Sequence, residues 1–548
     1  MTMDINSVNF KSKRDMKKIF KKITYLFGCT ALLFLTGCDD IIPEIKTLTL
    51  DRMFSPITLE AKVINKTQVR LNWAKISGAQ SFTVEVFADD SLTFAGTPVL
   101  TITGIKQDQL PYTILTGLIG ETKYSARVKA LGENITESKW STVFFKTDAE
   151  QIMTPVAESD IQALQVTIHW TAGESATDII LTSGTTEVRH TVTTAEITTG
   201  SALVTGLKED TKYSVKLLIG TKTRGSASFT TKIDLTAIGT IVVNLGGDLL
   251  GTIQSAAAGS RIVIVPSSVT DEYLTGGQIV EITKNLVIRG YSGSIRPIIH
   301  AYFKLSTADV SLTVRDVILD GTTATSLNLD HVLQFTTAAV YGNFILKDCV
   351  VKNYNKSLVS TGSLAADIAS ITFENCKVSN ILTTSADCID VRSGCLESLT
   401  LKNSTFSNCA SPASAPRDFI RLDDASSSFP GKVSVVSVDH CTFNKVSNGA
   451  SKRLLYVRFL NNQITFNNSV VANSLGLYTN QSATKVTFSK NNYFNAPEFL
   501  VSIIINSQVD ASGTQTLLDP GFVDSANGIL TITNAALLGL GTGASINW

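Results

Sequence analysis

The chain has 548 residues, which is too long for one hydrophobic core and predicts about three domains. Its 47 basic and 47 acidic residues cancel overall. Residues 1–37 hold seven Lys or Arg and two Asp, so the remainder has 40 basic against 45 acidic residues. A mildly acidic remainder without a basic cluster argues against nucleic acid as a partner.

The N-terminus has the features of an export signal. A basic stretch is followed by an apolar run of about 15 residues, shorter than the roughly 20 that a membrane-spanning helix needs. The sequence Leu35-Thr36-Gly37-Cys38 resembles a bacterial lipobox, and the two Asp that follow resemble the surface-export signal of Bacteroidetes lipoproteins. The resemblance implies a removed signal (1–37), a lipid on Cys38, a linker (38–53) and an outer-membrane anchor that faces the cell exterior. The alternative is an ordinary signal peptide with a chance cysteine.

Residues 54–148 and 152–232 repeat one strand pattern. Each copy has an alternating strand that ends in Trp (Trp73 and Trp170) and a later strand that begins at Tyr (Tyr124 and Tyr213). We expect the Trp to fill the space between two sheets and the Tyr hydroxyl to bond back to the preceding turn. The shared Gly-Leu-x(5)-Tyr spacing is similar to that of fibronectin type III domains, which implies two β-sandwiches that serve as spacers.

The pattern changes at residue 240. Residues 249–265 predict a short amphipathic helix and then a strand. Seven copies of a six-residue alternating strand follow at steps of 22–37 residues, beginning at residues 312, 344, 371, 399, 436, 464 and 486. Stacking of these copies as parallel strands would place one face of each in a lumen and pile equivalent side chains into ladders. The helix would cover the apolar end of the stack.

This entry and repeat closely resemble pectate-lyase-like proteins. The expected fold is therefore all-β, with two sandwiches followed by a right-handed parallel β-helix over 240–548 that begins with a short capping helix. The whole chain resembles uncharacterised surface lipoproteins of polysaccharide-utilisation systems. That resemblance implies a pectin-like acidic polysaccharide as partner, and a glycan transport complex of the outer membrane as a second partner.

The six cysteines of the C-terminal region suggest packing more than chemistry. Three of them end repeat copies, and with two serines they form one expected ladder of small side chains at a lumen corner: Cys349, Cys376, Ser404, Cys441 and Ser469. The spacing does not favour zinc. A disulfide between Cys388 and either Cys395 or Cys409 stays open.

A second strand in each coil presents polar side chains outward. One column is expected to run through Gln334, Asp390, Arg421 and Tyr456, and another through Arg392, Asp423 and Arg458. Coils lie about 4.8 Å apart, so opposite charges would come within pairing distance. Such a row is either a ladder of ion pairs that solubilises an exposed sheet or a site for an acidic sugar polymer, through Arg–carboxylate contacts and ring stacking.

Two enzyme families share the resembled fold. A lyase would need Ca²⁺ and a basic Arg; the candidate ligands are Asp387, Asp390, Asp423 and Asp424, and the candidate bases are Arg392, Arg421 and Arg458. The lyase-type Trp-Ile-Asp-His and Arg-x-Pro-x-x-Arg elements are absent, and only 386–391 resembles a polygalacturonase element. The sequence favours binding without catalysis and makes no cofactor certain. The alternatives are a Ca²⁺-dependent lyase, then a non-glycan adhesin or structural surface protein.

Overall fold

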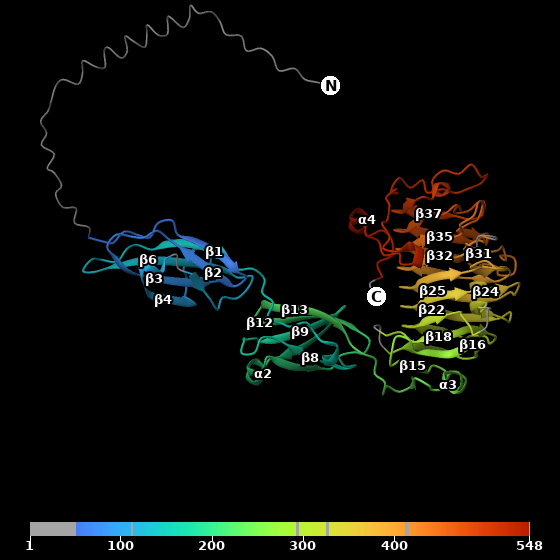
Figure 1. Cartoon of the computed structure of the whole chain (residues 1–548), viewed down its shortest axis with the longest axis horizontal. Coiled ribbons are helices and arrows are strands. Elements are labelled where there is room, and N and C mark those ends of the chain that lie inside the picture. Colours follow the sequence, from blue (N-terminus) through green and yellow to red (C-terminus); the bar gives the residue numbers. More distant parts are fainter. Residues whose placement is uncertain (1–50, 111–112, 292–294, 325–327, 412–415, 547–548) are drawn as a thin grey trace, which may run out of the picture. The chain divides into compact units, whose positions relative to one another are not determined.

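The computed structural model describes residues 51–110, 113–291, 295–324, 328–411 and 416–546 (Figure 1). The fold is all-β with a few short helices. The chain divides into two compact units, residues 1–150 and 151–548. The predicted signal segment, Cys38 and most of the expected linker lie outside the described residues. Within the described ranges, no helix has the length and hydrophobicity of a membrane span.

The first unit is a sandwich of two antiparallel sheets, with strand orders β1-β2-β5 and β4-β3-β6-β7. Trp73 and Tyr124 are both buried between the sheets. The Tyr124 hydroxyl accepts a hydrogen bond from the Ile119 N–H at 2.8 Å, so the predicted bond to the preceding turn is confirmed. The strands are β1 Glu60–Asn65, β2 Gln68–Asn72, β3 Ala79–Ala88, β4 Leu100–Ile105, β5 Thr113–Leu115, β6 Lys123–Gly132 and β7 Ser141–Lys146.

The second unit begins with a similar sandwich, with strand orders β11-β8 and β10-β9-β12-β13. Trp170 is buried, and the Tyr213 hydroxyl accepts from the Lys208 N–H at 3.0 Å. The same two side chains therefore have the same roles in both copies. The elements are β8 Gln165–His169, β9 Asp178–Ser183, β10 Thr186–Thr191, α2 Thr194–Thr199, β11 Ser201–Thr205, β12 Lys212–Ile219 and β13 Lys222–Thr230.

Residues 240–546, here called the body, are built on two large parallel sheets. The first is 11-stranded and is called wall 1. Its strands are β14 Thr240–Asn244, β15 Arg261–Val265, β17 Leu286–Gly290, β19 Leu312–Arg315, β22 Val340–Lys347, β25 Asp367–Glu374, β28 Cys395–Leu396, β29 Ser398–Lys402, β32 Ser434–Asp439, β35 Asn462–Asn467 and β37 Val486–Ser489.

The predicted register of the repeat is confirmed in wall 1. The first residues of the seven copies pair directly along the sheet, from Leu312 with Phe344 to Ile464 with Val486. Alternate residues of each copy point into a continuous apolar core. A parallel strand with one buried face must keep this register, because a slip by one residue would turn its apolar side chains outward.

The second sheet is 14-stranded and has two runs that meet at β18 Ile298–Leu305, with β16 Glu272–Ile282 beside it. Each turn of the chain passes from wall 1 to wall 2, then wall 3, then back. Wall 2 consists of β20 Ile318–Asp320, β23 Val350–Tyr354, β26 Lys377–Ile381, β30 Thr405–Ser407, β33 Thr442–Asn444, β36 Val470–Ala472 and β38 Asn492–Phe494. Wall 3 consists of β21 His331–Phe335, β24 Ser357–Gly362, β27 Ile389–Val391, β31 Ile420–Leu422 and β34 Leu455–Val457.

The corner between walls 1 and 2 is a tight bend in the left-handed backbone region. Asp, Asn, His or Lys takes this position at φ between 44° and 58°, at Asp316, Asp348, Asn375, Asn403, His440, Asn468 and Lys490. Asp and Asn tolerate this conformation better than other non-glycine residues. The next residue of each copy is buried, which confirms the ladder of Cys and Ser. All six cysteines of the body are free, so neither possible disulfide of Cys388 forms.

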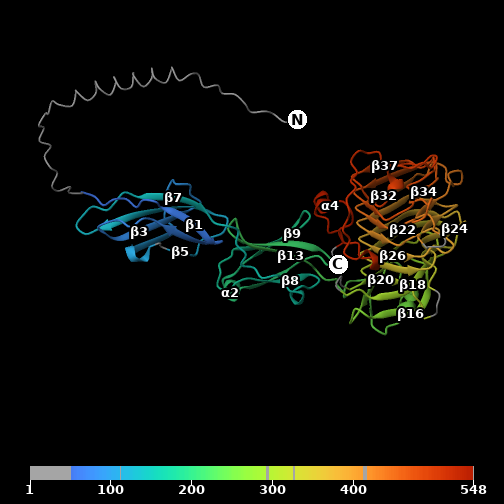
Figure 2. The same ribbon diagram turned by 45° about the horizontal axis from the view of Figure 1, so that its top comes forward.

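The two ends of the body are closed differently (Figure 1). Helix α3 Leu249–Ser255 precedes β15 and buries Leu249 and Ile253, as the sequence predicted. After β38, residues 516–546, here called the C-terminal strap, return along the outside of wall 2 and include helix α4 Ala535–Leu540 (Figure 2). The strap backbone donates to Asn468, Thr442 and Asn403 in turn, across three successive turns.

Ion pairs join the second sandwich to the first strands of wall 1. The Arg289 side chain is 6% exposed and contacts Asp210 at 2.9 Å and Asp316 at 2.5 Å. Arg315 also contacts Asp210, at 2.8 Å. Burial alone would raise the pKa of Asp210, but the guanidinium groups of Arg289 and Arg315 outweigh it and lower that pKa.

Candidate functional site

The outward column predicted on wall 3 exists, with one correction. Asp390 pairs directly with Arg421, and Arg421 pairs with Tyr456. Gln334 does not precede Asp390, because β24 lies between them and contributes Ser360 to the column. The sequence of β24, Ser-Leu-Val-Ser-Thr-Gly, carries no charge, and its polar residues are small and largely buried. It therefore lacked the signal that revealed the neighbouring strands.

Two successive segments of wall 3, at β27 and β31, each hold an ion pair of their own. Arg392 donates two parallel hydrogen bonds of 2.8 Å to the carboxylate of Asp390. Arg421 donates two hydrogen bonds to the carboxylate of Asp423 in the same way, at 3.0 and 2.9 Å. Residues two apart in a strand lie on the same face, which explains both pairs. The paired-fork geometry is the strong form of an Arg–carboxylate contact.

Further pairs connect successive turns. Arg421 Nη1 contacts Asp387 Oδ2 at 3.2 Å, and Arg458 Nη2 contacts Asp423 Oδ1 at 2.9 Å. A third fork, which the sequence analysis missed, joins Arg453 to Asp418 at 2.9 and 2.6 Å. A signal for it was present, because Asp387, Asp418 and Arg453 each stand two residues before a wall 3 strand.

In this row the carboxylates lie deeper in the protein than the guanidinium groups. The carboxylates are nearly buried, with Asp387 and Asp390 2% exposed, Asp418 3% and Asp423 9%. The guanidinium side chains above them are 19–37% exposed, from Arg453 to Arg458. Four Asp and four Arg balance in number, but the layer that meets solvent is cationic.

Tyr456 lies at the centre of the outer layer. The Cζ atom of Arg453 is 3.8 Å from its ring centroid, that of Arg458 is 5.0 Å away and that of Arg421 is 5.4 Å away. Guanidinium groups at these distances are attracted to the negative face of the ring. The ring and its three arginines therefore hold one another in place.

The ion pairs shift the pKa values of Arg392, Arg421 and Asp423. The hydrogen bonds that Arg421 donates to Asp423 raise the pKa of Arg421 well above its usual value, and those that Arg392 donates to Asp390 raise the pKa of Arg392. Burial would raise the pKa of Asp423, but Arg421 and Arg458 outweigh it and lower that pKa. A catalytic Arg base must lose its proton, which these pairs oppose. The arrangement of Arg392 and Arg421 therefore does not suit the proton-abstracting role that a lyase requires.

The four predicted calcium ligands do not form a metal site. Asp387, Asp390 and Asp423 face guanidinium groups, and the exposed Asp424 accepts a hydrogen bond from the Ser426 N–H. In the described part of the chain, no group of three or more His, Cys, Asp or Glu is arranged to hold a metal ion. Carboxylate density in the sequence does not reveal the arginines that pair with Asp387, Asp390 and Asp423.

Two family models match the body. Residues 271–409 match "Domain of unknown function (DUF4957)" and residues 436–546 match "Domain of unknown function (DUF5123)". The chain matches no curated protein. Among solved structures it is similar to a two-domain fibronectin type III segment of chicken tenascin, with 19% identity, 32% of this chain and 97% of that chain covered, and a TM-score of 0.23. It is also similar to the central fibronectin III array of RIM-binding protein, with 20% identity, 34% and 63% covered, and a TM-score of 0.14.

Proposed function

We propose that the body is a right-handed parallel β-helix that binds an acidic, pectin-like polysaccharide along wall 3. Right-handedness is the expectation for parallel strands joined by crossovers. The observation that carries the binding proposal is the depth separation of charge, because it leaves a cationic, ring-centred layer over buried carboxylates. The sequence analysis expected this row as one of two alternatives, and the depth separation favours the binding one.

The buried carboxylates give the arginines fixed positions before any ligand arrives. The fork of Arg392 occupies two of its guanidinium nitrogen atoms, and the side chains of Arg392 and Arg458 remain 35% and 37% exposed. A polymer of sugar acids presents carboxylates at regular intervals and can meet these edges one turn after another. Prior ordering of long side chains removes part of the entropy cost of binding.

The remaining regions fit a protein held at the cell surface. We propose that Cys38 carries a lipid anchor in the outer membrane and that two fibronectin type III domains act as spacers, with a glycan transport complex as a further partner. Metabolic labelling with a radioactive fatty acid tests the anchor: label should enter the wild-type protein and be absent from Cys38→Ser. Equal labelling of both proteins would refute the anchor and leave the wall 3 proposal intact.

Affinity electrophoresis through polygalacturonate tests the binding proposal. The full chain should be retarded by polygalacturonate and much less by fully methyl-esterified pectin, which lacks the carboxylates. Arg392→Gln and Arg458→Gln keep a polar donor but remove a positive charge, and each should weaken binding about five- to tenfold. Lys402→Gln is the matched control, since Lys402 is an exposed cation on wall 1.

Three outcomes would contradict the proposal. Equal retardation of wild type and both arginine variants would remove wall 3 from the binding surface. Ca²⁺-dependent appearance of an unsaturated product, seen by ultraviolet absorbance and lost in Arg421→Ala, would establish the lyase alternative instead. Retardation by neither polymer would leave the adhesin or structural alternative.

A further inference from the structure

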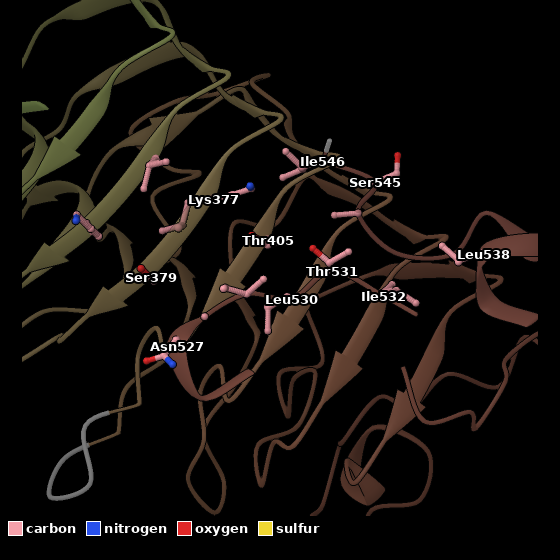
Figure 3. A pocket seen from close by; sticks show the side chains of 16 residues that line it. Lys377, Ser379, Thr405, Asn527, Leu530, Thr531, Ile532, Leu538, Ser545 and Ile546 are labelled. Atoms are coloured by element: carbon pink, nitrogen blue, oxygen red, sulfur yellow. The ribbon is translucent and has the colours of Figure 1, made fainter. Parts of the chain in front are cut away.

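A cavity of about 310 Å³ lies between wall 2 and the C-terminal strap, on a different wall from the arginine row. This volume is at the lower end of the range of roughly 300–1,000 Å³ found for small-molecule sites. Figure 3 shows Lys377, Ser379 and Thr405 on the wall 2 strands, with Leu530 and Ile546 coming from the strap.

The cavity exists because the strap divides as it crosses wall 2. One arm turns at the 3₁₀ helix Ser525–Asn527, and a Cβ atom placed on Gly528 of that arm would lie 3.8 Å from the side chains of Ser379 and Ser407. The other arm is fastened by the Ser545 N–H, which donates to Asn403 at 2.7 Å. The space between the arms is lined from below by outward side chains of β23, β26 and β30.

The lining combines aliphatic groups with positive charge. Leu530 and Ile532 are buried at the strap side, and Ile546 and the α4 residue Leu538 complete an aliphatic surface. Lys352 and Lys377 are the charged members among the described lining residues, and none of these residues is acidic. Lys352 also pairs with Asp320 behind it, at 3.1 Å, which holds its ammonium group at the wall.

From this lining we infer that the cavity binds a small aliphatic carboxylate, with the hydrocarbon chain against Leu530 and Ile532 and the carboxylate at Lys377. Hydroxyl groups of Ser379 and Thr405 lie in the same lining and can donate to the carboxylate. This ligand is distinct from a polysaccharide, because the lining offers no aromatic ring for a sugar to stack on.

The electrostatics around Lys377 agree with an anionic ligand. Burial lowers the pKa of Lys377, and the nearby guanidinium of Arg296 lowers it further. A carboxylate bound there would oppose both effects. Ligand binding should therefore strengthen at a pH where Lys377 is fully protonated.

Isothermal titration calorimetry of the full chain with octanoate tests the inference, with 1-octanol as the uncharged probe. Octanoate should bind saturably and at least about tenfold more tightly than 1-octanol, as one charge-assisted hydrogen bond implies. Lys377→Gln should abolish that preference, and Lys352→Gln should reduce it. Ser379→Phe fills the cavity and should remove binding of both probes, while Lys402→Gln on wall 1 should change nothing.

The outcomes separate clearly once thermal unfolding shows that each variant is folded. No saturable octanoate binding, or binding that Ser379→Phe leaves unchanged, would overturn the site. Equal affinity for octanoate and 1-octanol would overturn the carboxylate assignment. Polygalacturonate retardation depends on wall 3, so either proposal can fail while the other stands.

Discussion

Acidification should weaken the part of the body that surrounds His331. This side chain is 5% exposed on the first strand of wall 3, and its Nδ1 atom lies 2.7 Å from the Ser357 hydroxyl oxygen on the next turn. Burial lowers its pKa from 6.5 to about 4; the carboxylate of Asp330 acts in the opposite direction, and Lys356 in the same direction as burial. The imidazole is therefore neutral in the folded protein at pH values where the unfolded chain is already protonated.

The magnitude follows from this difference. The folded-state pKa lies below the unfolded value, so stability is complete above about pH 6.5 and is lost as the pH falls toward about 4. Each pKa unit corresponds to about 1.4 kcal/mol. Between pH 7 and pH 5 the local free energy of opening should therefore fall by about 2 kcal/mol through His331 alone.

Hydrogen exchange followed by mass spectrometry measures this loss, because peptides from β21 and β24 report opening of these strands. The exchange rates at pH 7 and pH 5 must first be corrected for the intrinsic effect of pH. His331→Gln keeps a polar side chain that does not titrate, so its peptides should lose about 2 kcal/mol less than those of the wild type. Other titrating groups are common to both proteins and cancel. The reasoning is refuted if wild type and variant lose the same opening free energy.

Three further predictions concern packing. Arg289→Met removes one of the two arginine partners of Asp210 at the joint to the second sandwich, and limited proteolysis should become faster near the fully exposed Ile238. Unchanged cleavage would show that the joint does not depend on the Arg289 pair. Phe406→Ala removes a buried ring whose centroid lies 5.1 Å from that of Phe443, on which it stacks. Denaturant titrations should show that the free energy of unfolding falls by about 3–5 kcal/mol. A loss below about 1 kcal/mol would argue against a tightly packed core. The six cysteines of the body are free and buried, so they should resist a thiol reagent in the native protein and should all react after denaturation. If fewer than six react, a disulfide is present.

Wall 1 was predictable because each copy has six alternating residues and a small residue at the corner. That pattern reports burial of one face directly, and the register from Leu312 to Val486 followed from it. The strands of wall 2 are mostly three residues long, too short to show a period, so they were not recognised. β24 was missed for a related reason, since its outward side chain, Ser360, is small and uncharged.

The arginine row was only partly predictable. Periodicity identified Asp390, Arg421 and Tyr456 as one column, and the pairing of β27, β31 and β34 confirms it. It could not show that Asp390 is 2% exposed, because depth depends on how the arginine side chains fold over the strand. The calcium hypothesis rested on the density of carboxylates in the sequence, which shows neither this burial nor the neighbouring arginines. The strap lay beyond sequence reasoning, because Ser545 meets a partner 142 positions earlier.

The strap also affects the order in which the turns of the body would unfold. A stacked fold loses turns most easily from an uncovered end, since a terminal turn has one neighbour instead of two. Here the last turns are fastened to Asn403, several turns back, by the final residues of the described chain. Unfolding from the C-terminal side must first break these strap contacts. Mechanical pulling on the C-terminus should therefore show a separate force peak before the turns unfold. The opposite end is covered by helix α3, and the ion pairs of Arg289 and Arg315 with Asp210 tie it to the second sandwich.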